Sequence, residues 1–149
     1  IDACRLAGIA LVIAGDGPER EALVARARAD EAATAVTFTG QVDDDELARL
    51  RAGAAIALVP SRSAETFGLA AAEAMAAGLP VVASRAGALA DLVEETALVA
   101  PGDARALAQA IGRLAGDEGA GERARERVRA ICAPERVAGA LARIYDGSA

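Results

Sequence analysis

Glu65 and Glu73 are the residues of this chain best placed to do chemistry. They stand in a Glu-x7-Glu spacing, and Glu73 is the only charged residue from Thr66 to Ser84. A carboxylate among apolar neighbours loses hydration, which is costly unless another polar group replaces the water. No basic residue lies within a helical turn of Glu73. Its carboxylate therefore reaches solvent, caps backbone donors or binds a polar ligand. A vicinal diol such as a ribose suits it, because a carboxylate can accept two hydroxyl protons.

The segment before Glu73 predicts an anion site. A long connection, residues 60–68, joins a predicted strand to a predicted helix. At the start of that helix Phe67, Gly68 and Leu69 would present free backbone N–H groups, which bind anions together with the helix dipole. Gly68 would let a phosphate or a sugar approach the backbone closely. A diol acceptor about one and a half turns further along is the arrangement that a nucleotide requires.

Structural alternatives stay open from spacing alone. Glu65 could cap the helix, and Gly68 could simply accommodate close packing. The short glycine pair Gly15 and Gly17 indicates by itself no more than a tight turn.

The composition limits which classes of protein the chain can belong to. The 149 residues suit one domain, and the apolar fraction of 54% suits an independent core. A net charge of −6 argues against a general nucleic-acid partner, which would require a basic face. No apolar run is long enough to span a bilayer.

Several catalytic classes are excluded by missing residue types. The chain contains neither His nor Lys. It therefore cannot complete a Ser-His-Asp or Cys-His centre, a pyridoxal-phosphate Schiff base or a P-loop. No cluster has the spacing of a metal site. Cys4 and Cys132 are interpreted as buried or idle reduced thiols, which favours a cytoplasmic location.

Strands and helices alternate along the sequence. This order predicts an α/β fold with a doubly wound, Rossmann-like parallel sheet, helices on both faces and ligands at the carboxyl ends of the strands. Asp103 and one of Asp43, Asp44 and Asp45 are expected to cap helices, and Gly78 is expected to end one. The predicted strands cover residues 9–14, 35–39, 54–59, 80–84 and 96–100; the predicted helices cover residues 18–30, 43–52, 68–77, 103–114, 121–131 and 134–145.

These motifs resemble the C-terminal, donor-binding half of the retaining GT-B glycosyltransferases, specifically family 4, the glycosyl transferases group 1. The two glutamates match that family's Glu-x7-Glu motif, and further signatures follow in the same order over nearly the whole chain. The matching segments are residues 13–18, 36–40, 60–69, 73–84 and 98–103.

The resemblance implies a role for each matched position. Glu73 would bind the ribose hydroxyls of a nucleoside-diphosphate sugar, and Glu65 would act catalytically, contacting the donor sugar near the reacting centre. Backbone groups from Thr66 through Phe67 and Gly68 to Leu69 would contact the sugar and the diphosphate. Gln41 and Val42 would lie near the base, and Gly15 joins the donor-binding set. The implied reaction is metal-independent glycosyl transfer with retention, with no cofactor besides the donor.

The resemblance also implies missing parts. The family's N-terminal acceptor domain and the central first strand of this half have no counterpart in the 149 residues, so residues 1–149 are interpreted as one N-terminally truncated donor domain. Peripheral membrane association would occur through the absent half. The terminal helices are expected at residues 121–131 and 134–145, the latter with an exposed apolar face.

Two consequences follow for fold and function. We predict a five-stranded parallel sheet in which the strands flanking the missing one pair directly; two separate ladders would instead indicate an excised fragment. We do not expect the 149 residues to catalyse transfer alone. The alternative function is a non-catalytic or degenerate Rossmann-like module that binds nucleotide-sugar.

Overall fold

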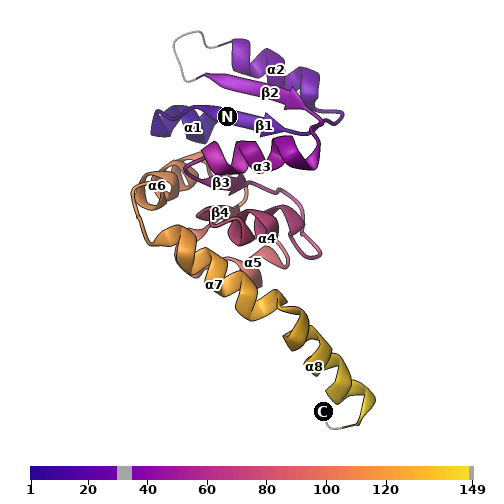
Figure 1. Ribbon diagram of the computed structural model, residues 1–149. Coiled ribbons are helices and arrows are strands. Elements are labelled where there is room, and N and C mark those ends of the chain that lie inside the picture. Colours follow the sequence, from indigo (N-terminus) through magenta and orange to yellow (C-terminus); the bar gives the residue numbers. More distant parts are fainter. Residues whose placement is uncertain (30–34, 148–149) are drawn as a thin grey trace.

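A computed structural model describes residues 1–29 and 35–147 of the chain. Strands and helices alternate as predicted, and the last helix extends away from the rest of the molecule (Figure 1). The elements are α1 (Asp2–Ala7), β1 (Leu11–Ala14), α2 (Arg20–Arg28), β2 (Val36–Gly40), α3 (Asp44–Gly53), β3 (Ala57–Val59), α4 (Leu69–Ala76), β4 (Val81–Ser84), α5 (Leu89–Leu92), the 3-10 turn η1 (Glu95–Ala97), β5 (Leu98–Val99), α6 (Ala104–Leu114), α7 (Ala120–Cys132) and α8 (Pro134–Tyr145).

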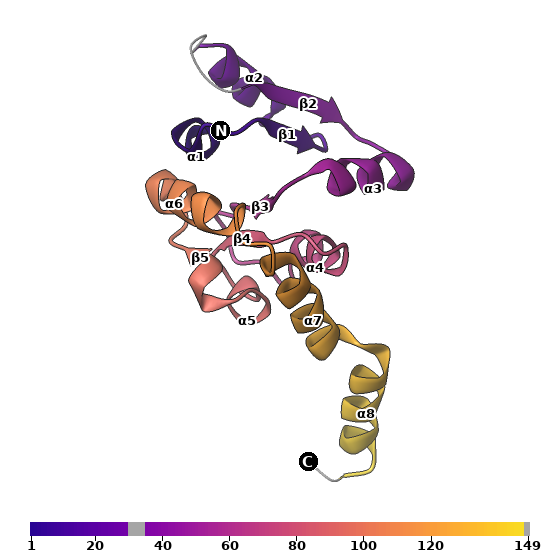
Figure 2. The same ribbon diagram turned by 60° about the vertical axis from the view of Figure 1, so that its left-hand side comes forward.

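The strands form two parallel sheets. One has two strands, β1 and β2, and the other has three, in the order β3-β4-β5. The prediction of one five-stranded sheet is therefore wrong, because β1 does not pair with β3 (Figure 2).

Helix packing explains the separation of the sheets. On the side of the three-stranded sheet that faces β1, α1 packs against α6. The apolar side chains of Ile9, Leu11, Ile56 and Leu58 all pack against the same core cluster. These contacts fill the space with side chains, whereas backbone pairing would need the strands within about 4.8 Å of each other.

The three-stranded sheet is buried on both faces. Every residue of β4 is buried. Val81 and Ala83 belong to a cluster with Met75 and Leu89, from α4 and α5, and Val82 belongs to a second cluster on the α1 and α6 side. This sheet therefore has the doubly wound packing, with helices on both faces, that the alternation of strands and helices predicted.

The two-stranded sheet is much less covered. Exposure alternates along β1, where Val12 is 49% exposed. Neither α2 nor α3 contains a buried residue. This sheet therefore has little apolar burial to stabilise it.

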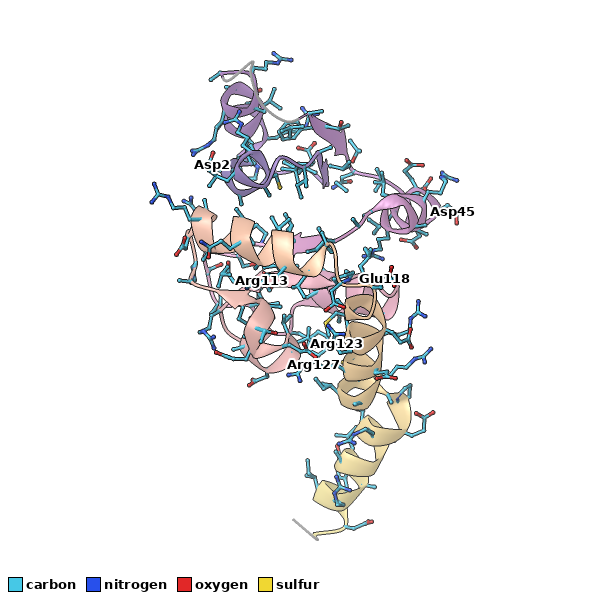
Figure 3. All side chains as sticks on the ribbon, turned by 90° about the vertical axis from the view of Figure 1, so that its left-hand side faces the viewer. Asp2, Asp45, Arg113, Glu118, Arg123 and Arg127 are labelled. Carbon is cyan, nitrogen blue, oxygen red and sulfur yellow. The ribbon has the colours of Figure 1, made fainter. Side chains whose placement is uncertain are left out.

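Two arginines of helix α7 form hydrogen bonds with the C-terminal ends of two other helices. Arg125 donates hydrogen bonds to the carbonyl oxygens of Ala76 and Ala77, at the end of α4. Arg127, which is labelled in Figure 3, donates to the carbonyl oxygens of Leu92 and Asp91, at the end of α5, at 2.6 and 2.8 Å. These contacts satisfy carbonyl groups that a helix end leaves without partners.

Gly121 allows the close approach of α7 to the end of α4. A Cβ atom on Gly121 would lie 2.1 Å from the carbonyl oxygen of Gly78. Gly78 has φ of 84° and lies directly beyond the C-cap of α4, Ala77. The prediction that Gly78 ends this helix is confirmed.

The other predicted helix ends are also found. Asp43 caps α3 and Asp103 caps α6, each accepting a hydrogen bond from a backbone N–H three residues on. Four predicted strands are shorter in the structure: 9–14, 54–59, 80–84 and, most clearly, 96–100, which is reduced to β5. Pro18 lies just before α2 rather than in its first turn, and the expected end of that helix, residue 30, lies outside the described residues.

Both cysteines are free thiols, as predicted. Cys4 is buried, and burial raises the pKa of its thiol. Cys132 is half-buried. Within the described ranges, no helix combines the length and apolar character that a membrane span requires.

Candidate functional site

The loop that carries Glu65 is held against the strand-to-helix connection after β4. The N–H of Glu65 donates to the carbonyl oxygen of Ala86 at 3.4 Å, and its carbonyl oxygen accepts from Ala88 at 2.9 Å. Glu65 also forms an isolated parallel bridge with Gly87. Two loops at the carboxyl ends of neighbouring strands thus fix the backbone of Glu65.

Gly87 is essential to this contact, a role that the sequence did not reveal. Its φ is 58°, and a Cβ atom there would lie 2.3 Å from the carbonyl oxygen of Glu65 and 2.7 Å from its nitrogen. No other residue type fits both the backbone conformation and the space.

Among the residues that the structure describes, the side chain of Glu65 has one hydrogen-bond partner. The hydroxyl of Ser61 donates to its Oε1 at 2.6 Å, which orients the carboxylate. No side chain caps α4, whose N-cap is Gly68, so the alternative that Glu65 caps this helix does not hold. The missed partner, Ser61, lies four residues earlier in the same loop, a spacing that could have suggested it.

The first turn of α4 has the free donors that the sequence predicts. Gly68 has φ of 86°, and a Cβ atom on it would lie 2.6 Å from Leu89 Cδ2. Among the described residues, no acceptor meets the backbone N–H groups of Phe67, Gly68 and Leu69. Phe67 and Leu69 are exposed beside them. Gly68 itself is buried against Leu89, so it does accommodate close packing, and this helix end is open to an acceptor from solution at Phe67 and Leu69.

Glu73 has an ion-pair partner that sequence spacing did not reveal. Arg51 Nη2, from the last turn of α3, donates to Glu73 Oε2 at 2.5 Å. The Glu73 side chain is 54% exposed, so it reaches solvent as well. Along α4 the rise is about 1.5 Å per residue, which places Glu73 about 6 Å from Leu69 along the helix axis.

The remaining predicted residues lie on the other sheet. Gly15 follows β1, with φ of 120°, and its N–H donates to the carbonyl oxygen of Gly40 at 2.7 Å. Gln41 is exposed and Val42 is half-buried, both directly after β2. In the part of the chain that the structure describes, no hydrogen bond or ion pair joins Gly15, Gln41 or Val42 to Glu65 or Glu73.

The predicted site residues are thus in two groups. Glu65, Glu73 and the segment from Thr66 to Leu69 lie together around the start of α4. Gly15, Gln41 and Val42 lie at the end of the two-stranded sheet. Helix α3 connects the two groups, because it begins just after Val42 and its last turn contains Arg51, which contacts Glu73.

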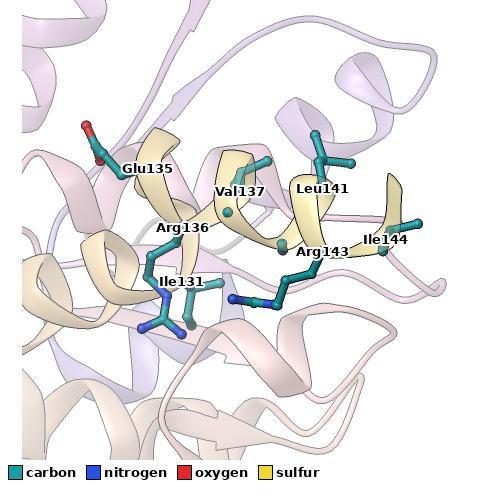
Figure 4. Close-up of a pocket in the computed structure, with 9 residues that line it drawn as sticks. Ile131, Glu135, Arg136, Val137, Leu141, Arg143 and Ile144 are labelled. Carbon is teal, nitrogen blue, oxygen red and sulfur yellow. The ribbon is translucent and has the colours of Figure 1, made fainter. Parts of the chain in front are cut away.

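A separate hollow lies away from both groups. It has a volume of about 660 Å³ and lies along α8, where Val137, Leu141 and Ile144 are exposed (Figure 4). The expected apolar face of residues 134–145 is therefore confirmed. Glu135, Arg136 and Arg143 also line the hollow, and α8 packs against α7.

No group of three or more His, Cys, Asp or Glu suited to a metal ion occurs within residues 1–29 and 35–147. The chemistry that the described site can perform is therefore recognition of an anion by the free N–H groups of α4, with hydroxyl recognition by two carboxylates beside it.

The fold and the site together define a Rossmann-like α/β domain with unpaired backbone donors at a strand-to-helix junction, among the residues that the structure describes. The family model for "Glycosyl transferases group 1" matches residues 2–117. The chain therefore belongs to the glycosyl transferases group 1.

Individual relatives agree with this assignment. A glycogen synthase of Mycobacterium tuberculosis is 37% identical over 145 residues, which cover 93% of this chain and 35% of the relative. The solved sucrose-phosphate synthase of Thermosynechococcus elongatus is 34% identical with a TM-score of 0.78, covering 98% of this chain and 41% of that one. Anabaena Alr3699/HepE in complex with UDP is 25% identical with a TM-score of 0.72, covering 94% and 43%.

These matches define which part of the enzyme fold is present. The chain spans about a third of the length of the curated relative and corresponds to the C-terminal Rossmann-like domain of GT-B glycosyltransferases. The resemblance found in the sequence is confirmed at the level of family and fold.

Proposed function

We propose that this chain forms the donor-binding part of a retaining glycosyltransferase, which transfers a sugar from a nucleoside-diphosphate sugar to an acceptor. One observation carries the proposal: the uncapped N-terminus of α4 lies between two carboxylates, Glu65 in the loop before it and Glu73 on the helix. A nucleoside-diphosphate sugar has the matching order of groups, with an anionic diphosphate between a sugar and a ribose.

Each group of the donor then has a partner. The backbone N–H groups of Phe67, Gly68 and Leu69 bind the diphosphate, and Thr66 contributes to the same stretch of backbone. Glu73 accepts hydrogen bonds from the ribose hydroxyls through its exposed carboxylate. Glu65, oriented by Ser61, accepts from the donor sugar.

The second group of residues would bind the base. Gln41 and Val42 lie between β2 and α3 in the sequence. Gly15 supports this end of β2, because its N–H donates a hydrogen bond to Gly40. In this proposal, residues at the ends of both sheets contact the same donor molecule.

The transfer step breaks the bond between the anomeric carbon and the diphosphate oxygen, and the acceptor oxygen bonds to the anomeric carbon on the same face. The proton of the acceptor hydroxyl passes to the departing diphosphate. The departing diphosphate gains negative charge, which the N-terminus of α4 stabilises through its donors and dipole. Glu65 contacts the sugar as positive charge develops at the anomeric centre. No metal ion or cofactor takes part in the proposed reaction. Acceptor recognition, and any peripheral contact with a membrane, belong to a further domain of the complete enzyme.

Calorimetry with nucleoside diphosphates tests the donor site. UDP is the first probe, because Alr3699/HepE is solved with UDP; GDP and ADP follow. Glu73→Ala removes hydrogen bonds to a charged acceptor, worth about 1.5–3 kcal/mol, so the dissociation constant should rise about 10- to 100-fold.

Glu126→Ala is the matched control, because Glu126 is an exposed carboxylate on α7. It should bind as the parent does. Unchanged affinity in Glu73→Ala would contradict the proposed ribose contact.

A further inference from the structure

The ion pair between Arg51 and Glu73 fixes one half of the proposed ribose acceptor. Arg51 lies in the last turn of α3, and its Nη2 contacts only Oε2 of Glu73. Among the described residues, Oε1 of Glu73 has no hydrogen-bond partner. The guanidinium therefore holds the carboxylate in one orientation and leaves its other oxygen available to a ligand.

The two partners differ in how far they are covered. The Arg51 side chain is 23% exposed, whereas the Glu73 side chain is 54% exposed. The arginine is thus the more fixed member, and the carboxylate it contacts faces solvent. A neighbouring arginine on α3 does not do this: Arg49 is 69% exposed and pairs with Glu46 on its own helix.

Stability alone is a poor explanation of this contact. Ion pairs that are open to solvent contribute little to the free energy of unfolding. Orientation of a binding group is a different matter, since a ligand gains affinity when the protein does not have to order the group on binding.

We propose that Arg51 is a positioning residue that tunes this chain toward ribonucleoside diphosphates through Glu73. The proposal rests on the proposed function and deepens it. Arg51 acts on the ligand only through the carboxylate, so its effect is confined to ligands whose ribose carries the hydroxyls that Glu73 accepts. Helix α3 also begins just after Val42, so the same helix connects the proposed base contact to the proposed ribose contact.

The test compares ribose with 2′-deoxyribose ligands. Dissociation constants of UDP, GDP and ADP and of their 2′-deoxy analogues are measured by calorimetry on the full chain, for the parent, Arg51→Gln, Arg51→Lys and Arg49→Gln. For the base that binds, the parent should prefer the ribose form about tenfold, the size of one hydrogen bond to a charged acceptor. Arg51→Gln should reduce this preference to about twofold, and it should weaken the 2′-deoxy form, which keeps its 3′-hydroxyl, less than the ribose form.

The controls separate positioning from folding. Arg51→Lys keeps the charge with fewer donors and should keep an intermediate preference. Arg49→Gln should keep the full preference. A urea-unfolding curve close to that of the parent serves as the check that Arg51→Gln is folded.

Each contrary result has its own meaning. If the parent binds none of the ligands, or does not discriminate ribose from deoxyribose, the proposed ribose site fails. If the parent discriminates and Arg51→Gln discriminates equally well, only the positioning role is overturned. Equal weakening of both forms, or tighter binding of the ribose form by Arg51→Gln, overturns it too.

Discussion

The two sheets of this protein differ in how firmly they hold the residues proposed to bind the donor. The three-stranded sheet is covered on both faces, and β4 is buried along its whole length. The two-stranded sheet is covered sparsely, with no buried residue in α2 or α3. Burial of apolar surface is the main source of stability. The loop of Glu65 and the start of α4 therefore lie on a rigid support, whereas Gln41 and Val42 do not.

The difference shows how one ligand site can be divided between a closely packed region and a sparsely packed one. Glycines at closely packed positions fix the first group: both Gly68 and Gly87 lie where a Cβ atom would collide with a neighbour. At Gly15 and Gly40, on the two-stranded sheet, a Cβ atom would meet nothing within 4 Å. Their positive φ values shape the turns, but neither residue locks one loop against another.

The largest expected effect follows from that contrast. Gly87→Ala places a methyl group 2.3 Å from a backbone oxygen at positive φ, and should lower the free energy of unfolding by about 3 kcal/mol or more. Gly17→Ala, where nothing lies within 4 Å, should stay within about 0.5 kcal/mol of the parent. Urea unfolding of both variants measures the difference. An equal loss of stability in both variants would show that the two regions are packed equally tightly.

A smaller effect is expected at the contact of α7 with α5. Arg127→Ala leaves the carbonyl oxygens of Asp91 and Leu92 without their donor, and should cost about 1–2 kcal/mol. Arg49→Ala, on α3 beside the two-stranded sheet, removes only a surface pair and should change stability by less than about 0.5 kcal/mol. Thermal and urea unfolding provide the comparison; a neutral Arg127→Ala would remove α7 from the support of the site.

The smallest effect concerns pH and the pair that joins α1 to α2. A hydrogen bond from Arg26 lowers the pKa of Asp2 below its usual 3.8. A carboxyl with a lowered folded-state pKa stabilises the fold above its unfolded-state pKa, and this contribution is lost as the pH falls through the folded-state value. Asp2→Asn should therefore cost up to about 1 kcal/mol at pH 7 and less at pH 2.

Urea unfolding at both pH values measures this effect, with Glu126→Gln as the control. A pH-independent cost for Asp2→Asn would show that the charge of Asp2 does not stabilise the two-stranded region.

Local features of the fold could be predicted from the sequence, whereas contacts between distant segments could not. Asp103 and Gly78 act on the nearest helix end, so their positions were sufficient to predict their roles. For α3 the sequence left three adjacent aspartates as candidates, of which Asp43 is the cap. The pairing of β1 with β3 was wrong: the two strands belong to separate sheets, and the positions of strands in the sequence do not show which strands pair. The same limit applies to Arg51, which is 22 positions from the carboxylate it contacts.

The candidate site shows this limit most clearly. The free donors of α4 and the exposure of Glu73 follow from local order, and both were anticipated. The contact of Gly87 with the loop of Glu65 joins residues 22 positions apart through the backbone, and a lone glycine in a sequence does not indicate what approaches it.

The attachment of α4 to α7 has a consequence for the heat of binding. Arg125 and Gly121 anchor the end of α4 opposite its free donors, so a ligand at those donors finds a helix that is already ordered. The loss of conformational entropy on binding then comes from ordering the sparsely packed residues 41 and 42. Ligands that reach only the helix should bind with a small entropic penalty, and the penalty should appear when a base is added to them.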